Sequence, residues 1–396
     1  MPSDHGRSWV PFRPTDADLT AIGADVNEIP RIQQTLVDRC SHLRCPDRVA
    51  HQYQIAGSQV LFEVTPHLPQ ILEGVGLFTS GATHRGIGRI STGLGTPHVE
   101  AEPDFLGLML AFQTTDGHRV DFLAINHPAA PTDDHRDFMS VLHATGESAG
   151  ARVPFVGEWG DRDVGNFFAQ QVMFLDALRD RMGSIRAVRT VAHLTKQATP
   201  TAFSTTAYQP YWTGIAEVQR TAGKFTMVPV RDENTRLALR PGEHHFSEDW
   251  KMRQRTGPLD FSLYWIPYLD EQRTPSRELT AAWEESHREL VGTVRFPQLD
   301  PDSDAARLWA MLAMEMGANH GHWVHDRENS IKEPATEFGV ARKIAYQRSQ
   351  DGRGSLAPET YRSVFTAGTI GSDLAQELRR RHEDKIKAGH VSSAST

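Results

Sequence analysis

Residues 341–353 read Ala-Arg-Lys-Ile-Ala-Tyr-Gln-Arg-Ser-Gln-Asp-Gly-Arg, and the interpretation of the whole chain depends on this stretch. If the segment is a helix, Arg342 and Tyr346 stand four residues apart on one face, and Arg353 follows two turns along that face. A cation beside a phenol favours the phenolate, and a phenolate oxygen is a suitable ligand for Fe(III). The alternative is an ordinary basic helix whose tyrosine faces the core.

The composition is that of a globular protein and argues against several kinds of partner. Of the 396 residues, 39% are hydrophobic and 23% are charged, and the formal net charge is -8. A core of this size can enclose a bulky cofactor. Because the net charge is negative and Lys and Arg are not massed in one block, we expect no nucleic-acid partner. No stretch of 18 apolar residues occurs, so we expect no membrane span.

The cysteines and histidines predict no structural metal site. Cys40 and Cys45 are the two cysteines, and with His42 they fall short of a four-ligand zinc site. The histidines at 320–325 and 244–245 also lack a recognisable ligand spacing. The N-terminal residues contain no apolar run of the kind found in signal peptides. We therefore expect the protein in a reducing cytoplasm.

The hydrophobic pattern predicts a mixture of strands and helices. The predicted strands cover residues 49–64, 86–91, 105–113, 120–125, 224–230, 261–269 and 289–296. Predicted helices begin at Thr15 and at Pro30, and others cover 133–144, 164–181, 304–316, 341–353, 358–365 and 373–387. Residues 231–258 are polar, and residues 317–337 read as a loop. Strands do not alternate strictly with helices, so the fold class is α+β and not a doubly wound sheet.

Two short patterns make local predictions inside these strands. Gly57-Ser58 interrupts the first strand and predicts a β-bulge. Asp116-Gly117 lies between two apolar runs and predicts a β-hairpin. Neither a Gly-rich phosphate loop nor a Gly-x-Ser-x-Gly elbow is present, so the sequence points away from dinucleotide, P-loop and α/β-hydrolase chemistry.

Several short fragments occur in one order along the chain: Arg48-Val49-Ala50-His51, Phe62-Glu63-Val64-Thr65, Arg89-Ile90-Ser91-Thr92, the Asp104-x-x-Gly107 pair, residues 121–128, and Arg342, Tyr346 and Arg353. In this order they resemble the haem catalase superfamily, and in particular its compact branch of organic peroxidases and allene oxide synthases. The resemblance spans residues 48–353. It departs from the family between the first two fragments, where the chain is one residue longer, and in residues 317–337 before the last fragment.

The resemblance implies an antiparallel β-barrel core of the catalase type with surrounding helices and one buried haem b. It divides the chain into an N-terminal arm and helix (1–45), a haem-binding β-barrel domain (46–355), and C-terminal helices with a frayed tail (356–396). We also expect a homo-oligomer, a dimer or a tetramer, although the sequence does not determine the number of subunits.

The resemblance also assigns roles to individual residues. Tyr346 is the expected iron ligand, and Arg342 would keep it ionised. His51 is the expected distal acid–base group. Residues expected to contact the haem are Arg48, Arg89 and Arg353 at the propionates and Phe138 against the porphyrin. Each arginine could instead be a solvated surface cation, and Phe138 could be plain core.

Two positions on the distal side remain open. Asn126 is the expected partner of the peroxide, but counting from Asp121 puts the family's catalytic asparagine at Ile125, and Asn126 could equally be a turn-forming residue. Ala50 is smaller than the valine of true catalases or the threonine of allene oxide synthases, so room for an organic substrate is expected beside His51.

The expected function is cleavage of the O–O bond of a peroxide at a haem, with an organic or fatty-acid hydroperoxide preferred. Three alternatives stay open: a catalase or peroxidase for hydrogen peroxide, a haem-dependent biosynthetic tailoring enzyme, and a haem-binding protein without catalysis. The small-molecule peroxide is the expected substrate partner.

Overall fold

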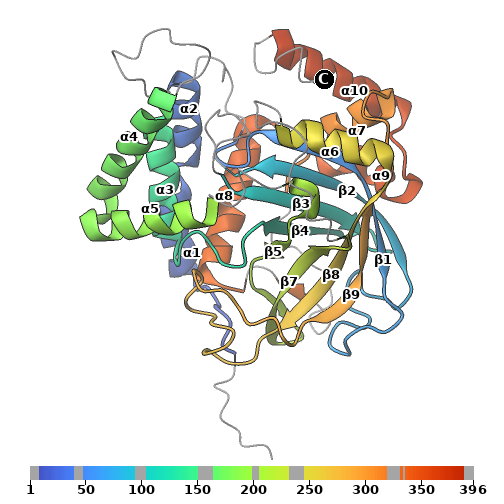
Figure 1. Ribbon diagram of the computed structural model, residues 1–396, viewed down its shortest axis with the longest axis horizontal. Helices are drawn as coiled ribbons and strands as arrows, with labels where there is room; N and C mark the ends of the chain where they lie inside the picture. Colours follow the sequence, from blue (N-terminus) through green and yellow to red (C-terminus); the bar gives the residue numbers. More distant parts are fainter. Residues whose placement is uncertain are drawn as a thin grey trace, which may run out of the picture.

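Eight strands of this chain close into an antiparallel β-barrel, and helices pack on the outside of that barrel (Figure 1). The structure is a computed structural model, and it describes residues 9–39, 48–93, 104–149, 164–198, 205–231, 245–318, 331–332 and 335–387. The predicted fold class, α+β with a catalase-type antiparallel barrel, is confirmed. No helix in these ranges is both long and apolar enough to cross a membrane.

The barrel follows the strand order β1-β2-β3-β4-β5-β7-β8-β9 and closes where β9 pairs with β1. The short strands β6 and β10 extend the sheet beyond β7. The strands are β1 (Gln54–Val64), β2 (Thr83–Thr92), β3 (Leu106–Gln113), β4 (Arg119–Ile125), β5 (Tyr211–Thr213), β6 (Ala216–Val218), β7 (Thr221–Pro229), β8 (Leu259–Pro267), β9 (Glu289–Phe296) and β10 (Ile331–Lys332). Closure pairs the strand edges that would otherwise be exposed.

Aromatic side chains fill much of the barrel interior. Phe62, Phe112, Phe122 and Phe225 are almost completely buried, and their rings meet at centroid distances of 5.3–6.2 Å. Such edge-to-face and tilted contacts are the favoured arrangement for aromatic rings. The interior is therefore a packed core, and a large cavity has to lie outside the barrel wall.

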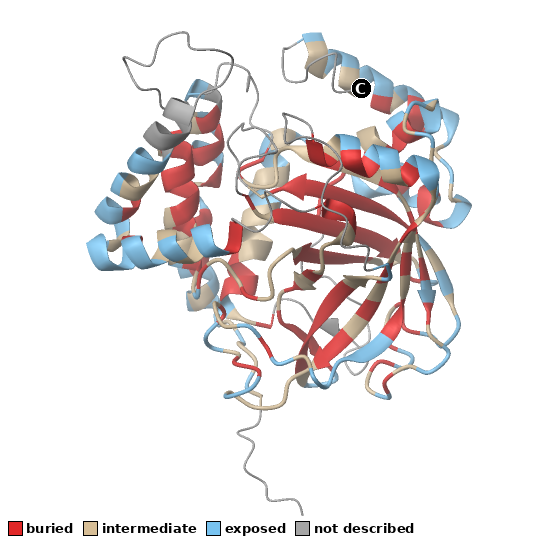
Figure 2. Cartoon of the chain, viewed as in Figure 1, coloured by how far each residue is buried: buried red, intermediate tan, exposed pale blue. Residues whose placement is uncertain are grey.

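The helices form two groups around the barrel. They are α1 (Asp16–Val26), α2 (Ile29–Arg39), α3 (His135–Ser148), α4 (Val164–Met182), α5 (Ser184–Ala198), α6 (His245–Thr256), α7 (Asp304–Glu315), α8 (Glu337–Arg353), α9 (Pro358–Ala367) and α10 (Ser372–Lys387). α7 and α9 pack on β2, and α10 packs on α7. On another side, α1, α2 and α3 contact α8, and α4 and α5 continue this layer outward from α3 (Figure 1). Figure 2 shows the barrel strands buried and the outer faces of α4 and α5 exposed.

Most local predictions agree with the structure. Thr15 caps α1 in a capping box with Asp18, and Pro30 lies in the first turn of α2. The hairpin between β3 and β4 turns at Gly117, whose φ of 87° requires a glycine. The helix predicted over 341–353 is present and begins four residues earlier, at Glu337.

The predicted bulge at Gly57-Ser58 is wrong. The register of β1 against β2 shifts between Gln54 and Ala56 instead. Gly57 has a packing role: a Cβ there would lie 2.7 Å from Ala313 Cβ and 2.9 Å from Ala310 Cα. The glycine is therefore present because α7 approaches the strand closely at that point.

Pattern reasoning missed some elements. It gave no helix for α5, and it placed no element in the polar residues 231–258, which contain α6. It also missed the three-residue strands β5 and β6, which are too short to show a period. The predictions on Cys40, Cys45, the histidines at 320–325 and the tail after 387 lie outside the described residues.

Candidate active site

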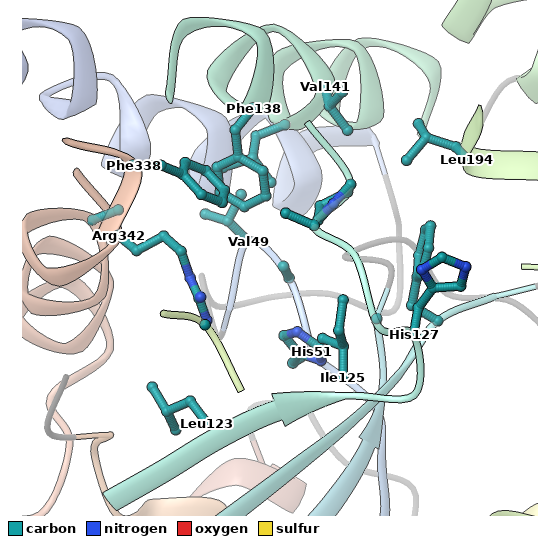
Figure 3. Close-up of a pocket in the computed structure, with 18 of the residues that line it drawn as sticks. Val49, His51, Leu123, Ile125, His127, Phe138, Val141, Leu194, Phe338 and Arg342 are labelled. Atoms are coloured by element: carbon teal, nitrogen blue, oxygen red, sulfur yellow. The ribbon is translucent and has the colours of Figure 1, made fainter. Parts of the chain in front are cut away.

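A cavity of about 440 Å³ lies between the barrel wall and the helical layer. That volume is in the range of small-molecule and cofactor sites, roughly 300–1,000 Å³. Its walls come from the segment 48–51, the residues just before β3, the end of β4, the loop 127–131, and helices α3, α4, α5 and α8. Figure 3 shows His51, Ile125 and His127 on the strand side of this space and Arg342 and Phe338 on the α8 side.

Helix α8 presents its predicted face to the cavity. Thr336 caps its first turn, and Gly354 ends it with a φ of 61°. Arg342, Tyr346 and Arg353 all line the cavity. The Arg342 guanidinium lies 5.8 Å from the centre of the Tyr346 ring and 5.9 Å from that of Phe338. The helical spacing read from the sequence therefore places a cation against the tyrosine ring, as predicted.

Two further arginines of the cavity wall converge at the end of α7. Arg48 Nη2 donates to Met314 O at 2.8 Å and to Met316 O at 3.5 Å. Arg353 donates to the same two carbonyls, at 3.4 and 3.2 Å. A helix C-terminus favours nearby cations because its carbonyl groups carry partial negative charge. The two guanidinium groups, which are 305 positions apart in the sequence, are thus held side by side at one edge of the cavity.

His51 is held in an unusual backbone conformation. Its φ is 56°, which is uncommon for a residue other than glycine and costs on the order of 1–3 kcal/mol. The peptide groups on both sides are fixed: His51 N donates to Gly93 O at 2.9 Å, and Arg89 Nη2 donates to His51 O at 2.7 Å. The imidazole of His51 is therefore aimed into the cavity by a strained but well-supported backbone.

The hydrogen bonds of the His51 ring assign its tautomer. Nδ1 lies 3.1 Å from Thr92 O and 3.4 Å from Ser91 Oγ. A carbonyl oxygen can only accept, so Nδ1 carries the proton that it donates to Thr92, and Nε2 carries the free lone pair. Burial, and then the charges of Arg89 and Arg342, lower the pKa of His51 to about 4. The ring is neutral at pH 7 and can accept a proton at Nε2.

The floor under His51 is a row of paired residues on neighbouring strands. Ser91 on β2 pairs with Gly107 on β3, and Gly107 pairs with Ile125 on β4. A Cβ at Gly107 would lie 2.4 Å from His51 Nδ1. The imidazole therefore occupies the space that any other side chain at 107 would fill. This is the physical reason for a glycine three residues after Asp104.

Arg89 has a different position from the one expected for a propionate ligand. It is not among the residues that line the cavity, and it is 4% exposed. Its guanidinium donates to Gln54 Oε1 at 3.1 Å and to the carbonyl of His51. These contacts favour a positioning role for Arg89 beneath the segment that carries His51.

Asn126 is also absent from the cavity wall, whereas Ile125 lines it. The Asn126 carboxamide accepts from Leu106 N at 2.7 Å and donates to Gln209 Oε1 at 2.6 Å. The side chain thus continues the β3–β4 pairing past the end of the strands. Of the two alternatives for Asn126, the structural one fits these contacts.

The remaining wall is largely apolar. Phe138 lines the cavity and packs against Phe338 with ring centres 5.2 Å apart. Other apolar lining residues are Val49, Leu123, Val141, Leu142, Phe174 and Leu194. Among the polar residues of this wall that sequence reasoning missed are Lys224 on β7 and His127. A lysine inside a strand gives no local signal, because only the cross-strand neighbours determine what it faces.

The donor set of the cavity fits a haem. Tyr346 offers a phenol oxygen from one wall, His51 offers an imidazole from another, and Arg48 and Arg353 offer guanidinium groups that match carboxylates. The apolar side chains between them suit a porphyrin face. The described residues hold no group of three or more His, Cys, Asp or Glu that could bind a bare metal ion.

Comparison with known proteins gives a likeness in fold. No family model and no curated protein matches the chain. Among solved structures, it is similar to a fungal catalase (TM-score 0.56, 15% identity, covering 78% of this chain and 59% of that one). It is also similar to a bacterial catalase (0.55, 18%, 89% and 64%) and to catalase A of Saccharomyces cerevisiae (0.54, 15%, 80% and 62%).

At 15–18% identity these likenesses concern the fold alone. The chain spans less than two thirds of the length of each of these three catalases. The closed eight-strand barrel agrees with these likenesses. The chain has the catalase fold.

Proposed function

We propose that this protein is a haem-dependent enzyme that activates or cleaves the O–O bond of a peroxide. The observation that carries the proposal is that Tyr346 and His51, from opposite ends of the sequence, line one cavity in a fold shared with catalases. A bound haem supplies the iron at which a peroxide is activated. Tyr346 would be its ligand, and Arg48 and Arg353 would pair with its carboxylates.

The chain's own residues supply the proton transfer. Heterolysis requires a proton to leave one peroxide oxygen and reach the other, and one neutral imidazole can do both. His51 Nε2 is the acceptor because Nδ1 donates to Thr92 O. Arg89 and Gly107 keep the ring in place, the first through the His51 carbonyl and the second by leaving room for the imidazole.

We propose an organic hydroperoxide as the substrate, in preference to hydrogen peroxide. The side chain beside His51 on the strand floor is Ile125, which cannot hydrogen-bond a small peroxide. Ala50 and the leucines and valines of the wall add apolar surface. An apolar wall favours a substrate with hydrocarbon, since burial stabilises by roughly 25 cal/mol per Å² of apolar surface.

The test begins with the full-length chain titrated with haemin and followed by its visible absorption spectrum. The loaded protein is then given cumene hydroperoxide or hydrogen peroxide, with oxygen evolution measured against oxidation of a reducing dye. We expect dye oxidation with the organic peroxide to exceed oxygen evolution from hydrogen peroxide. Rapid oxygen evolution with no gain on the larger peroxide would favour a catalase, and a chain that takes up no haemin would end the proposal.

His51→Ala separates catalysis from binding. Removing a general acid–base group costs about 10²–10⁴-fold in rate, so turnover is expected to fall by that much while haemin uptake is kept. His287→Ala is the matched control, because His287 is exposed and does not line the cavity. Equal turnover in the two variants would favour a haem-binding protein without catalysis.

A further inference from the structure

Lys224 is a buried lysine in the wall of the cavity, and the proposed proton transfer does not use it. It lies on β7 opposite Ile266 of β8 and is 4% exposed. Its ammonium donates to Pro128 O at a long 3.4 Å and lies 4.8 Å from the ring centre of Trp283. Among the described residues, Pro128 O is the one hydrogen-bond acceptor that it meets.

Within the described part of the chain, this environment gives the buried ammonium fewer hydrogen-bond acceptors than it has N–H donors. A lysine carries three N–H donors, and burying an ammonium without good hydrogen bonds is costly. The nearby Glu285 acts on it only through its field, since that carboxylate accepts from Trp212 Nε1 at 2.5 Å and pairs with Arg288 at 3.3 Å. Burial lowers the pKa of Lys224 to about 8, with Glu285 opposing the shift, so the group is still mostly a cation at pH 7.

The position of Lys224 separates it from the arginines assigned to the haem carboxylates. Arg48 and Arg353 meet at the carbonyls of Met314 and Met316. Lys224 instead reaches Pro128, the residue after His127, and Figure 3 shows His127 on the other side of His51 from Arg342. The cavity therefore has a second cationic position, beside the loop that follows β4.

We propose that Lys224 binds the carboxylate of an apolar, carboxylate-bearing ligand whose hydrocarbon part lies along the wall of the cavity. An ammonium in an apolar site attracts an anion strongly because little water screens it. The Trp283 ring holds the ammonium from one side, and the cavity offers the remaining side. That this ligand is the peroxide substrate rests on the proposed function, whereas the carboxylate site itself does not.

The experiment compares a carboxylate with its neutral ester. The full-length chain, without and with haemin, is titrated with octanoate and with methyl octanoate, and binding is followed by tryptophan fluorescence, because Trp212 lines the cavity and Trp283 contacts Lys224. A charge-assisted hydrogen bond is expected to favour the acid by about tenfold or more. In Lys224→Met the acid and the ester should bind within about twofold of each other.

Lys343→Met is the matched control, since Lys343 is half-buried on α8 and does not line the cavity. It should keep the preference for the acid. Equal affinity of the wild-type chain for acid and ester overturns the proposal. A Lys224→Met variant that keeps the preference for the acid also overturns the proposal. If that variant binds haemin more than about tenfold more weakly, Lys224 serves a carboxylate of the cofactor instead. A chain that prefers the acid but takes up no haemin would refute the proposed function and leave the carboxylate site standing.

The wild-type chain gives a second measurement that needs no variant. A carboxylate stays ionised well above pH 5, so of the two members of the proposed ion pair only Lys224 changes its charge through the alkaline range. With the pKa of Lys224 at about 8, the affinity for octanoate should fall about tenfold for each pH unit above that value. The affinity for the ester should not follow this fall. Octanoate affinity that is constant from pH 7 to 10 would contradict the proposal.

Discussion

The two walls that face each other across the cavity are built by different kinds of geometry. On α8, Arg342, Tyr346 and Arg353 share a face because they are four and seven residues apart on one helix. On the barrel, the floor beneath His51 is made of Ser91, Gly107 and Ile125, which meet only through strand pairing. The helical wall depends on local spacing, and the strand wall depends on register.

This difference determines how each wall tolerates change. A substitution on α8 alters the chemistry of one side chain, because the helix holds its neighbours in place independently. A substitution on the strand floor moves a residue on another segment, because His51 fills the space left by Gly107. Variants on the two walls should therefore fail in different ways, the first by losing a ligand and the second by displacing the imidazole.

The largest effect is expected for Tyr346→Phe on the helical wall. Removing even an outer partner of a metal ligand costs about 10–100-fold in metal affinity, so loss of the proposed ligand itself should weaken haemin binding by more than about 100-fold. The measurement is a haemin titration followed by the visible spectrum. Tyr264→Phe is the control, since Tyr264 contacts Arg288 and does not line the cavity. Unchanged spectra in both variants would show that Tyr346 is not the iron ligand.

The same contrast explains how much could be predicted from the sequence. The α8 face followed from the spacing of Arg342 and Tyr346. The strands followed from their periodicity, and their closure into a barrel was implied only by the resemblance. The role expected for Arg89 did not match its contacts, because the approach of β2 to the segment 48–53 brings its guanidinium to the His51 carbonyl and to Gln54. No local pattern carries that information.

The surroundings of Asn126 and Lys224 also depend on strand geometry and on segments distant in the sequence. Asn126 and Ile125 are adjacent in the sequence, but alternation along the strand turns Ile125 to the cavity and leaves Asn126 to bond Leu106 and Gln209. A one-residue slip in an alignment therefore exchanges a cavity-lining residue for a structural one. Lys224 was missed because its surroundings come from the loop after β4 and from Trp283, both distant in sequence.

Gly107→Ala should give the next largest effect, on the strand wall. The added methyl group would lie 2.4 Å from His51 Nδ1, so the ring has to move away from Thr92. We expect a loss of roughly 10–100-fold in peroxide turnover, since a displacement of about 1 Å can cost 10²-fold. Haemin affinity should stay within about threefold of wild type, measured as for Tyr346→Phe.

Gly371→Ala is a matched control for Gly107→Ala, because a Cβ at Gly371 meets no atom within 4 Å. If Gly107→Ala turned over peroxide as fast as Gly371→Ala, His51 would not need its present position. The two walls would then no longer differ in how they fail, because a substitution on the strand wall would not act by displacing the imidazole.

A smaller effect is expected from Asn126→Ala, and it should appear in stability. The variant removes the acceptor of Leu106 N and the donor to Gln209 Oε1, which costs roughly 1–3 kcal/mol in the free energy of unfolding. Turnover per haem should change by less than about threefold. Chemical denaturation and steady-state rates measure the two quantities. A stable Asn126→Ala variant with a large loss of turnover would restore Asn126 as a catalytic residue.

The smallest effect is a displacement of the pH profile. A histidine with an ordinary pKa of 6.5 would lose its base form in mild acid, whereas burial and the charges of Arg89 and Arg342 lower the pKa of His51 to about 4. Peroxide turnover should therefore stay constant from pH 8 to about pH 5 and fall only near pH 4. Rates are measured at each pH with haemin occupancy checked by the spectrum.

The free energy of unfolding, unlike turnover, should already fall between pH 6.5 and pH 4. His51 is neutral in the folded chain, but in the unfolded chain it binds a proton below pH 6.5, so protonation favours unfolding as the pH falls from 6.5 towards 4.

Arg89→Gln removes one of the charges that lower the pKa of His51, and the acid limb of turnover should then shift towards neutral pH. A merely structural role for Arg89 would reduce turnover equally at every pH. Because Arg89 touches His51 through its carbonyl, a shifted limb would show that the strand wall tunes the imidazole as well as holding it.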